Sequence, residues 1–160
     1  MIRSATADDA GAICDIYNHY VATTVVTFEE TRVTIEEMRQ RLDDVLSSHP
    51  FLVAEANGSV RGFAYASAWR ARSAYRFAVE TTIYLAPDST RRGLGSELYG
   101  NLISQLRVRR LHTAIGIVAL PNDGSTALHE SLGYVQVAEL KQVGWKFDRW
   151  IDVGYWQLTL

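Results

Sequence analysis

The chain has one cysteine, three prolines and no long apolar run. A single thiol, Cys14, cannot form an internal disulfide, and it cannot support a zinc cluster built on cysteine. No segment approaches the roughly 20 apolar residues of a membrane-spanning helix, and residues 1–6 lead into a helix pattern rather than a signal peptide. We therefore expect a cytoplasmic protein with no membrane partner.

An excess of one charge sign is also missing. The 16 Lys and Arg residues are balanced by 18 Asp and Glu residues, and the formal net charge is −2. A nucleic-acid binder needs a concentrated basic field, so we expect no nucleic-acid partner. His19, His49 and His112 show no ligand spacing with acidic residues, and we expect no metal. A length of 160 residues with 48% hydrophobic content predicts a single domain, residues 1–160.

The first half of the chain predicts two helices and a hairpin. A capping-box pattern begins each helix, Thr6-Ala-Asp-Asp9 and then Thr34-Ile-Glu-Glu37. Asn57-Gly58 suits the tight turn of a hairpin. The predicted elements are a strand at 2–5, a helix that ends near residue 20, a helix that stops before Pro50, and strands at 51–56 and 60–68.

The second half predicts one β-loop-α-β unit, then a helix and two closing strands. A strand at 77–85 leads into a glycine-rich turn and a helix, after which the apolar run 113–120 is typical of a buried parallel strand. A helix at 123–132, ending at Gly133, and strands at 134–140 and 154–160 complete the chain. The order predicts one α+β domain with a mixed, mostly antiparallel sheet and helices on both faces.

The glycine-rich turn, Thr90-Arg-Arg-Gly-Leu-Gly-Ser-Glu97, has the pattern of an anion-binding loop. Gly93 and Gly95 carry no Cβ, so backbone N–H groups can approach a ligand where the positive end of a helix dipole already points outward. The turn lacks the Lys-Ser/Thr ending of a P-loop. It predicts a phosphate-bearing ligand, with a glycine-tolerant helix start beside two solvated arginines as the alternative.

Several separated motifs, in order, resemble the GNAT superfamily of acetyl-CoA-dependent N-acetyltransferases. The glycine-rich turn and His129-Glu-Ser-Leu-Gly-Tyr134 carry the wider resemblance. More narrowly, the chain resembles phosphinothricin and methionine sulfoximine acetyltransferases. The motifs are Asn18-His-Tyr20, Trp69-Arg-Ala-Arg72, Ala74-Tyr75, Glu80-Thr-Thr-Ile-Tyr84, Leu120-Pro-Asn-Asp123 and Asp152-Val-Gly-Tyr-Trp-Gln157.

This resemblance implies direct transfer of an acetyl group from acetyl-CoA to a small amino-acid-like amine, in a homodimer. It also implies that two parallel strands of the sheet splay apart and leave backbone N–H groups for the oxyanion. Where the superfamily usually has Gln or Arg, this loop has Thr90. Asn122 and Ser125 could instead be ordinary helix caps. The implied acetyl-CoA site comprises Ile83, Tyr84, Leu85, Arg91, Arg92, Gly93, Leu94, Gly95, Ser96, Asn122 and Ser125.

Glu80 and His129 are the candidate catalytic residues. Glu80 lies in an apolar strand, where desolvation would raise its pKa toward the range useful for a general base. His129 matches the family position of the acid that protonates the leaving thiolate, and it could also relay the amine proton. The alternatives are a glutamate that faces water and a histidine with a structural hydrogen bond. Tyr134 is a second candidate for the acid.

Substrate recognition is predicted in a polar loop between two strands, because arginine offers a planar fork to a carboxylate or phosphinate. The narrower family commonly has Lys and Asn where this chain has Arg70 and Ser73. Trp145 and Lys146 of a dimer mate could add a further wall, and Cys14 is expected to be a packed thiol. The predicted substrate-binding residues are Arg70, Arg72, Ser73, Ala74, Tyr75, Phe28 and Glu29.

Two other functions are compatible with these residues. A protein or peptide N-acetyltransferase would need an open groove for a peptide. A CoA-binding regulatory module without turnover would not need both Glu80 and His129 beside the glycine-rich loop.

Overall fold

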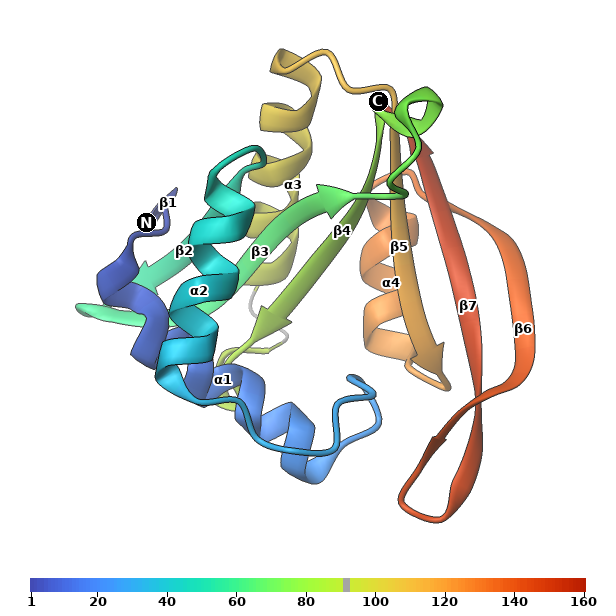
Figure 1. The fold of residues 1–160 in the computed structure, drawn as a ribbon, viewed down its shortest axis with the longest axis horizontal. Helices are drawn as coiled ribbons and strands as arrows, with labels where there is room; N and C mark the ends of the chain where they lie inside the picture. The colour runs from blue at the N-terminus through green and yellow to red at the C-terminus, as the bar shows by residue number, and fades with distance from the viewer. Residues whose placement is uncertain (91–92) are drawn as a thin grey trace.

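Seven strands form one mixed sheet in this computed structural model, which describes residues 1–90 and 93–160 (Figure 1). The order across the sheet is β1-β2-β3-β4-β5-β7-β6, and β4 and β5 run parallel while their neighbours pair antiparallel. The strands are β1 (Ile2–Ser4), β2 (Phe51–Ala56), β3 (Ser59–Ala68), β4 (Ala78–Leu85), β5 (Thr113–Leu120), β6 (Val135–Lys146) and β7 (Arg149–Thr159). The predicted α+β fold with a mixed sheet is confirmed.

In the described part of the chain, four α-helices cover the two faces of this sheet. They are α1 (Ala10–Thr23), α2 (Ile35–Leu46), α3 (Leu94–Val108) and α4 (Asp123–Ser131). In Figure 1, α1 and α2 lie in front of the sheet, and α3 and α4 lie behind it. Within the described ranges, no helix is long and apolar enough to cross a membrane, and no group of three or more His, Cys, Asp or Glu residues could hold a metal.

The helices begin where the capping boxes predict. Thr34 accepts a hydrogen bond from the Glu37 N–H, and the Glu37 carboxylate accepts one from the Thr34 N–H at 2.7 Å. At the first helix, the Asp9 carboxylate accepts the Thr6 N–H at 2.8 Å, but residues 7–9 form a 3₁₀ turn before α1 begins. Local sequence therefore fixes both entry points within a few residues.

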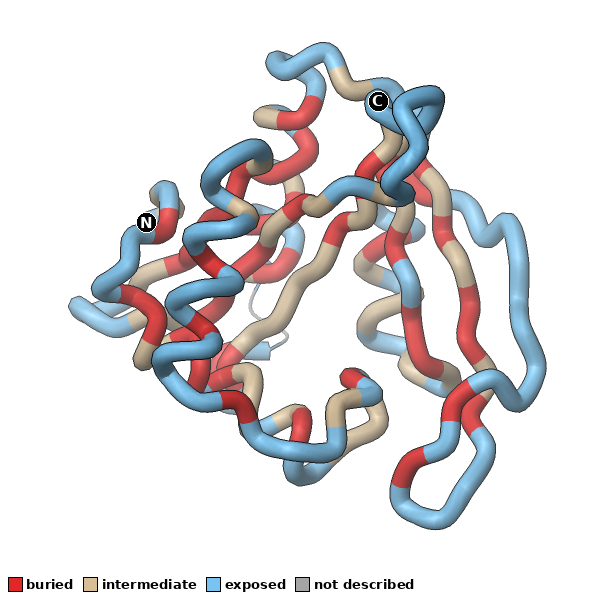
Figure 2. Tube along the Cα trace, viewed as in Figure 1, coloured by how far each residue is buried: buried red, intermediate tan, exposed pale blue. Residues whose placement is uncertain are grey.

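Two hydrophobic clusters hold the layers together. Figure 2 marks the buried positions along the strands and helices. One lies between the sheet and α3 and includes Leu98, Tyr99 and Leu102, which are fully buried. The other lies between the sheet and α1 and α2, with Ile13 and Leu42 at its centre. Alternate residues of β2, β3 and β4 enter opposite clusters, as the period of a strand requires.

The parallel strands β4 and β5 pair over only half of their length. Their register runs from Ala78 opposite Thr113 to Thr81 opposite Gly116, and beyond that point the two strands diverge. β4 stays paired with β3 as far as Leu85, and β5 stays paired with β7 as far as Leu120. The predicted splayed pair is thus present, and each strand keeps its outer neighbour.

The last two strands are longer than the sequence predicted. Strand β6 continues to Lys146 instead of ending at residue 140, and β7 begins at Arg149 instead of residue 154. The turn between them consists of Phe147 and Asp148, which have φ values of 51° and 55°. A two-residue turn with positive φ normally uses Asn-Gly, so the pair Phe147-Asp148 did not indicate a turn. Register shifts between Gln136 and Ala138 and between Leu140 and Gly144 also break the alternating pattern.

Candidate active site

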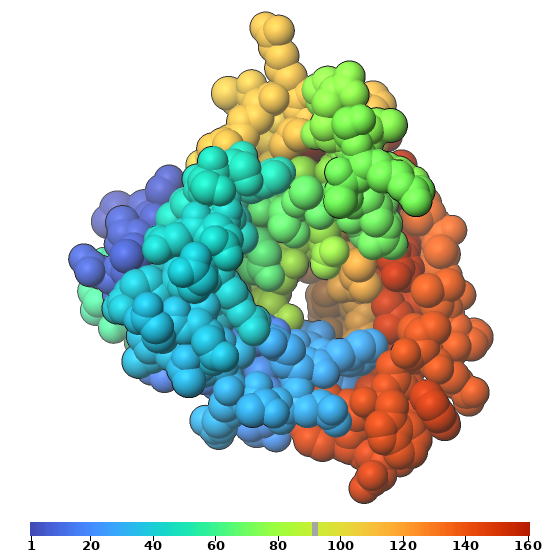
Figure 3. Space-filling model, viewed as in Figure 1, coloured from blue at the N-terminus to red at the C-terminus, as the bar shows by residue number. Residues whose placement is uncertain are grey.

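Two connected cavities lie where β4 and β5 part, and Figure 3 shows the opening beside the segment that follows α1. Their volumes are about 610 Å³ and about 230 Å³. The residues that line both are Val26, Ile83, Tyr84, Asn122 and Ser125. We call the first the larger cavity and the second the smaller cavity.

The larger cavity is built at the N-terminus of α3. Gly93 caps this helix with φ of 78°, a left-handed conformation that favours glycine. A Cβ on Gly95 would lie 3.3 Å from the Leu85 side chain and 3.4 Å from that of Leu128, so glycine allows close packing there. This cavity is lined by Thr90, Gly93, Gly95 and Ser96. Leu94 is half-buried and does not line it. The predicted Arg91 and Arg92 lie outside the described residues.

The backbone of β4 presents two N–H groups to the gap. The Ala86 N–H bonds to the Arg61 carbonyl of the preceding strand, so Tyr84, two residues earlier, also directs its N–H toward β3. By the same alternation, the N–H groups of Ile83 and Leu85 point toward β5, beyond the last paired residues. The three predicted amides therefore separate into two that face the gap and one, on Tyr84, that belongs to the β3 ladder.

Asn122 and Ser125 line both cavities and also begin α4. The Asn122 Oδ1 accepts the Ser125 N–H at 3.1 Å, which is an ordinary N-cap. The capping interpretation is thus correct for Asn122, and it is compatible with a place in the cavity wall. Tyr20, which belongs to the motif Asn18-His-Tyr20 but was not predicted as a site residue, also lines the larger cavity and donates to the Leu85 carbonyl at 2.6 Å.

Glu80 lies in the wall of the smaller cavity and is half-buried. Desolvation raises the pKa of its carboxyl, and the positive charge of Arg70 opposes that rise. Glu80 shares its face of β4 with Tyr84, which stacks against Phe63 in the α1 and α2 cluster. Its carboxylate therefore approaches the gap from the α1 and α2 face of the sheet.

His129 approaches the same cavity from the opposite face, on α4. It is 3% exposed, its Nδ1 lies 2.8 Å from the Ser125 carbonyl, and its Nε2 lies 3.0 Å from the Tyr99 hydroxyl. Burial lowers the pKa of the imidazole. Both ring nitrogens of His129 thus have hydrogen-bond partners within the protein, as expected for a histidine with a structural role. The ring nevertheless also lines the smaller cavity. Only the parting of the strands lets Glu80 and His129 share one cavity.

Gly116 makes room for this imidazole, and it was not among the site residues predicted from the sequence. A Cβ on Gly116 would overlap the His129 Nε2. Gly116 also forms the last parallel pair, with Thr81, so the ring lies directly behind the point where the strands part. The available signal was a glycine within the apolar strand Thr113–Leu120, which often marks a close approach of another group.

Tyr134, the second candidate for the acid, is buried behind the cavities. Its hydroxyl lies 2.9 Å from the Thr81 Oγ1, and its ring stacks on Tyr99. Burial raises the pKa of this phenol. Tyr134 lies outside the residues that line either cavity. Its contacts identify it as a core residue.

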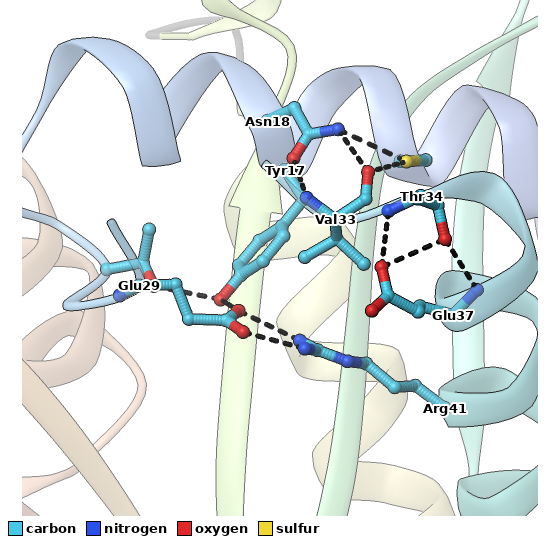
Figure 4. Close-up of polar contacts among 9 residues, drawn as sticks. Tyr17, Asn18, Glu29, Val33, Thr34, Glu37 and Arg41 are labelled. Atoms are coloured by element: carbon cyan, nitrogen blue, oxygen red, sulfur yellow. Dashed lines mark hydrogen bonds and ion pairs between the residues drawn. The ribbon is translucent and has the colours of Figure 1, made fainter. Parts of the chain in front are cut away.

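Glu29 secures the segment between α1 and α2, residues 24–34, which we call the α1–α2 loop. Its carboxylate accepts hydrogen bonds from Arg41 at 2.6 and 2.8 Å and from the Tyr17 hydroxyl (Figure 4). The Arg41 hydrogen bonds lower the pKa of Glu29. Glu29 was predicted to bind substrate, but it lies outside the cavity lining because Arg41 and Tyr17 already hold its carboxylate.

A second anchor holds the other end of this loop. The Asn18 side chain donates to the Val33 carbonyl and accepts the Val33 N–H, both at 2.8 Å (Figure 4). The Cys14 thiol donates to the same carbonyl at 3.1 Å and is buried, as the sequence predicted. The loop therefore leaves α1 and enters α2 through fixed contacts.

The tip of the α1–α2 loop packs against the end of β6. The Phe28 ring occupies the space that a Cβ on Gly144 would need, and Phe28 lines the smaller cavity as predicted. Lys146 is 1% exposed and donates from Nζ to the Thr27 carbonyl at 2.8 Å. Burial lowers the pKa of this ammonium. Lys146 thus braces a wall of its own chain, in addition to the wall that Trp145 and Lys146 of a dimer mate were predicted to offer; Trp145 is exposed.

The loop before β4 lies at the rim of the site. Arg70 stacks on Trp69 with its Cζ 4.4 Å from the ring centroid, and Trp69 meets Tyr155 edge-on. The predicted residues from Arg70 to Tyr75 are all exposed and lie outside the lining of both cavities. Of them, Arg70 is the one whose charge acts on Glu80.

Comparison with known proteins agrees with this geometry. A model of the acetyltransferase (GNAT) domain matches residues 2–154. Phosphinothricin N-acetyltransferase of Streptomyces viridochromogenes is 43% identical over 98% of this chain and 85% of its own length.

Two solved structures superpose on nearly all of the fold. A phosphinothricin acetyltransferase of Sinorhizobium meliloti, in complex with acetyl-CoA, gives a TM-score of 0.97 at 36% identity, covering 100% of this chain and 88% of that one. A ribosomal-protein-alanine N-acetyltransferase of Brucella melitensis gives 0.97 at 37% identity, covering 100% and 99%. The chain belongs to the GNAT family of N-acetyltransferases.

Proposed function

We propose that this enzyme acetylates the α-amine of a small amino-acid-like substrate of the phosphinothricin, methionine sulfoximine or methionine sulfone type, by direct transfer from acetyl-CoA. The observation that carries the proposal is the gap between β4 and β5. It joins a cavity at a helix N-terminus to a smaller one that contains a half-buried carboxylate. A thioester from one side and an amine from the other can meet in that gap.

The residues around the larger cavity suit acetyl-CoA in their chemistry. The N-terminus of α3 offers backbone N–H groups and a positive dipole end to a pyrophosphate. Ile83 and Leu85 direct N–H groups toward the gap, where the oxyanion of the tetrahedral intermediate would form. Asn122, Ser125 and the apolar side chain of Leu128 line the path between them, which suits a pantetheine arm.

Glu80 is the proposed general base. An α-amine has a pKa near 8, so its deprotonation at neutral pH costs only about 1.4 kcal/mol. Positioning can contribute roughly 7–11 kcal/mol, so holding amine and thioester together is the larger effect. Glu80 supports both tasks, because a carboxylate in the wall of the smaller cavity can bind the ammonium and then accept its proton.

His129 is the proposed partner of the leaving thiolate. A thiol has a pKa near 8.5, so the thiolate needs little help to leave, and a neutral imidazole nearby is sufficient to exchange one proton with it. This role is supported by the place of His129 in the same cavity as Glu80. In this proposal Arg70, which acts electrostatically on Glu80 from the rim, attracts the substrate carboxylate, with Arg72 and Tyr75 as secondary contacts.

A second candidate is acetylation of a protein N-terminus. The specific observation in its favour is the similarity to the ribosomal-protein-alanine N-acetyltransferase of Brucella melitensis. Against it, the α1–α2 loop closes one side of the smaller cavity through Phe28 and Lys146, and about 230 Å³ is little room for a peptide.

A panel of acceptors separates the candidates. Free thiol should be released from acetyl-CoA with phosphinothricin, methionine sulfoximine or methionine sulfone, and alanine-starting peptides should react at least about 100-fold less well in kcat/KM, roughly 2.7 kcal/mol of discrimination. Reaction with peptides alone would transfer the assignment to the second candidate. Acetyl-CoA binding without turnover on any amine would indicate a regulatory module.

We also propose that the enzyme is a homodimer that pairs through β6 and β7. These strands expose Val137, Val143, Trp145 and Trp150, and the two tryptophan rings lie 4.8 Å apart between centroids. An exposed apolar group of this kind commonly marks a protein interface. Light scattering should give twice the mass of the 17.9 kDa chain, and Trp150→Glu should shift it toward the monomer. A monomeric wild-type protein would contradict the proposal.

A further inference from the structure

An aromatic contact crosses the sheet beside the smaller cavity. Trp69 directly follows β3, and its ring meets that of Tyr155 on β7 edge-on, with 6.2 Å between the ring centroids. Strands β4 and β5 lie between β3 and β7 in the sheet, so the contact spans both of them. In Figure 3, the segment that follows β3 lies on the side of the opening away from the α1–α2 loop. The contact therefore belongs to a wall of the site that this loop does not supply.

The register of the sheet places both rings on the face that carries Glu80. The β3 partner of Glu80 lies two residues before Trp69, and the Trp69 N–H continues the same ladder, so the two side chains share a face. Tyr155 pairs with Ile117 and lies two residues from Val153, and both of these neighbours line the smaller cavity. The two rings, each half-buried, thus adjoin the cavity in which Glu80 lies.

The Trp69 ring holds the guanidinium of Arg70. The Arg70 Cζ lies 4.4 Å from the Trp69 ring centroid. Arg70 is exposed, and it forms none of the ion pairs found in the described part of the chain. A guanidinium that stacks through its face keeps the N–H groups of its edge for a planar anion such as a carboxylate. The stack therefore keeps the cation in one place and leaves its N–H fork to a ligand.

The charge of Arg70 reaches Glu80 across the edge of the cavity. Arg70 opposes the rise that burial causes in the pKa of the Glu80 carboxyl, and it acts through its charge, without a hydrogen bond between the two groups. The other titratable side chains around this carboxylate are neutral at pH 7 or already engaged by other groups, namely Tyr65, Tyr99, His129, Lys146 and the Glu29–Arg41 pair. Arg70 is therefore the cation that acts on the proposed base.

We propose that Trp69 and Tyr155 are positioning residues that hold Arg70 where it binds the carboxylate of the acceptor while Glu80 binds the amine. The inference rests on the proposed function and adds the chemical class of amine that the site selects. An acceptor with a carboxylate on the carbon next to the amine engages both side chains at once. An amine without that carboxylate loses the Arg70 contact and is a poor acceptor.

The same loop offers a matched control for this arrangement. Arg76 stacks on Phe77 with its Cζ 4.6 Å from the ring centroid, which is nearly the geometry of Arg70 on Trp69. Phe77 is exposed, and the charge that acts on Glu80 is that of Arg70. Phe77→Leu therefore removes a comparable stack from the same loop without releasing the cation beside the proposed base.

The test compares methionine sulfone with its carboxamide as acceptors, in wild type, Trp69→Leu, Trp69→Phe and Phe77→Leu. Wild type should prefer the carboxylate by at least about tenfold in kcat/KM. This preference should fall about fivefold in Trp69→Leu, as expected from the loss of one exposed cation–π contact. Trp69→Phe keeps a ring under the guanidinium and should stay within about twofold of wild type, and Phe77→Leu should leave the preference unchanged.

Two further readouts separate positioning of Arg70 from a general loss of structure. In Arg70→Gln the preference should already be lost, so that adding Trp69→Leu changes it no further. The pH-rate profile should also move. Glu80 is active as the ionised base, so activity falls as the pH drops through its pKa, and this limb should lie at higher pH in Trp69→Leu because Arg70 no longer opposes the raised pKa.

An unchanged preference in Trp69→Leu, or an equal loss in Phe77→Leu, would overturn the proposal. If Trp69→Leu does not fold, Tyr155→Leu decides, because it removes the edge-on contact and should lower the preference in the same direction. No change in that variant would also contradict the proposal. Calorimetric binding of the two compounds needs no turnover and should show the same loss of preference. Failure of the proposed acetyl transfer would therefore be seen separately.

Discussion

The two sides of the gap are held together in different ways. Most of the wall of the larger cavity comes from two consecutive units of the chain, β4 to α3 and β5 to α4, each of which joins a strand to the helix that follows it; Tyr20 of α1 and Val26 of the α1–α2 loop complete this wall. On the smaller cavity, a wall is formed by the α1–α2 loop, which is held by Arg41 on α2 and by Gly144 and Lys146 more than a hundred residues later.

The two cavities therefore differ in how much their shape depends on the contacts of particular side chains. The larger cavity needs the backbone of a helix start, the two glycines Gly93 and Gly95, and two amides that face the gap, so it depends less on its other side chains. The smaller cavity depends on how one loop meets β6, so a change at Gly144 can reshape it without touching the sheet core. We infer that the choice of acceptor is determined on the loop side.

The largest expected effect is that of Glu80→Gln. Removing the base should lower kcat/KM at pH 7 by about 100-fold, within the usual range for general-base catalysis, while the affinity for acetyl-CoA stays within about twofold. Burial raises the pKa of Glu80, so wild-type activity should fall as the pH drops through that raised value. This limb should disappear in the variant. A pH-rate profile with the same limb in both proteins would remove Glu80 from the mechanism.

A smaller effect on activity is expected from Gly116→Ala. The added Cβ would overlap the His129 ring, and overpacking of this kind costs about 1–3 kcal/mol of unfolding free energy. Because the imidazole must shift away from the gap, kcat should fall about tenfold. Urea denaturation and steady-state kinetics measure the two effects. Gly100→Ala, in an α3 position where a Cβ meets nothing within 4 Å, is the matched control.

Gly144→Ala should affect the two substrates unequally. The new methyl group would displace the Phe28 ring and with it the tip of the α1–α2 loop. We expect the KM for the amino-acid acceptor to change about fivefold and the KM for acetyl-CoA to stay the same, a difference of about 1 kcal/mol. Larger acceptors should gain relative to small ones. Equal changes in the KM for the acceptor and the KM for acetyl-CoA would contradict the inference that the α1–α2 loop determines the choice of acceptor.

The smallest effect is expected from Arg41→Gln. This change removes both hydrogen bonds to Glu29, but the Arg41 side chain is 48% exposed, so only a twofold to threefold rise in acceptor KM is expected. Arg41 holds the pKa of Glu29 below its usual value, so the pair stabilises the fold at neutral pH, and this contribution is lost as the pH falls through the lowered pKa. Melting temperatures of wild type and variant should therefore converge at low pH. Arg39→Gln, on the same helix and paired with Glu36, is the control.

Local patterns predicted most of the fold. The capping boxes, the Asn57-Gly58 turn and the apolar run of β5 all lie within a few residues of the elements that they determine. The β6–β7 turn was missed because Phe147 and Asp148 adopt positive φ without glycine. Gly93 and Gly95 were found because their loop is a contiguous motif.

Residues whose role depends on distant contacts were not predicted. Gly116 matters because His129 packs on it, and Gly144 matters because Phe28 does. Glu29 was expected to face the substrate, but a carboxylate within reach of Arg41 forms an ion pair that no local pattern reveals. The same limit applies to the Tyr99 hydroxyl, which meets His129 from another helix.

The most direct test of the account is the initial-rate pattern when acetyl-CoA and an amino-acid acceptor are varied together. If both substrates occupy the connected cavities and react across the gap, double-reciprocal plots should intersect, and no thiol should appear before the acceptor is added. Parallel lines, or a burst of about one thiol per enzyme from acetyl-CoA alone, would mean that an acetylated enzyme carries the group. Such a result would contradict direct transfer between the two cavities.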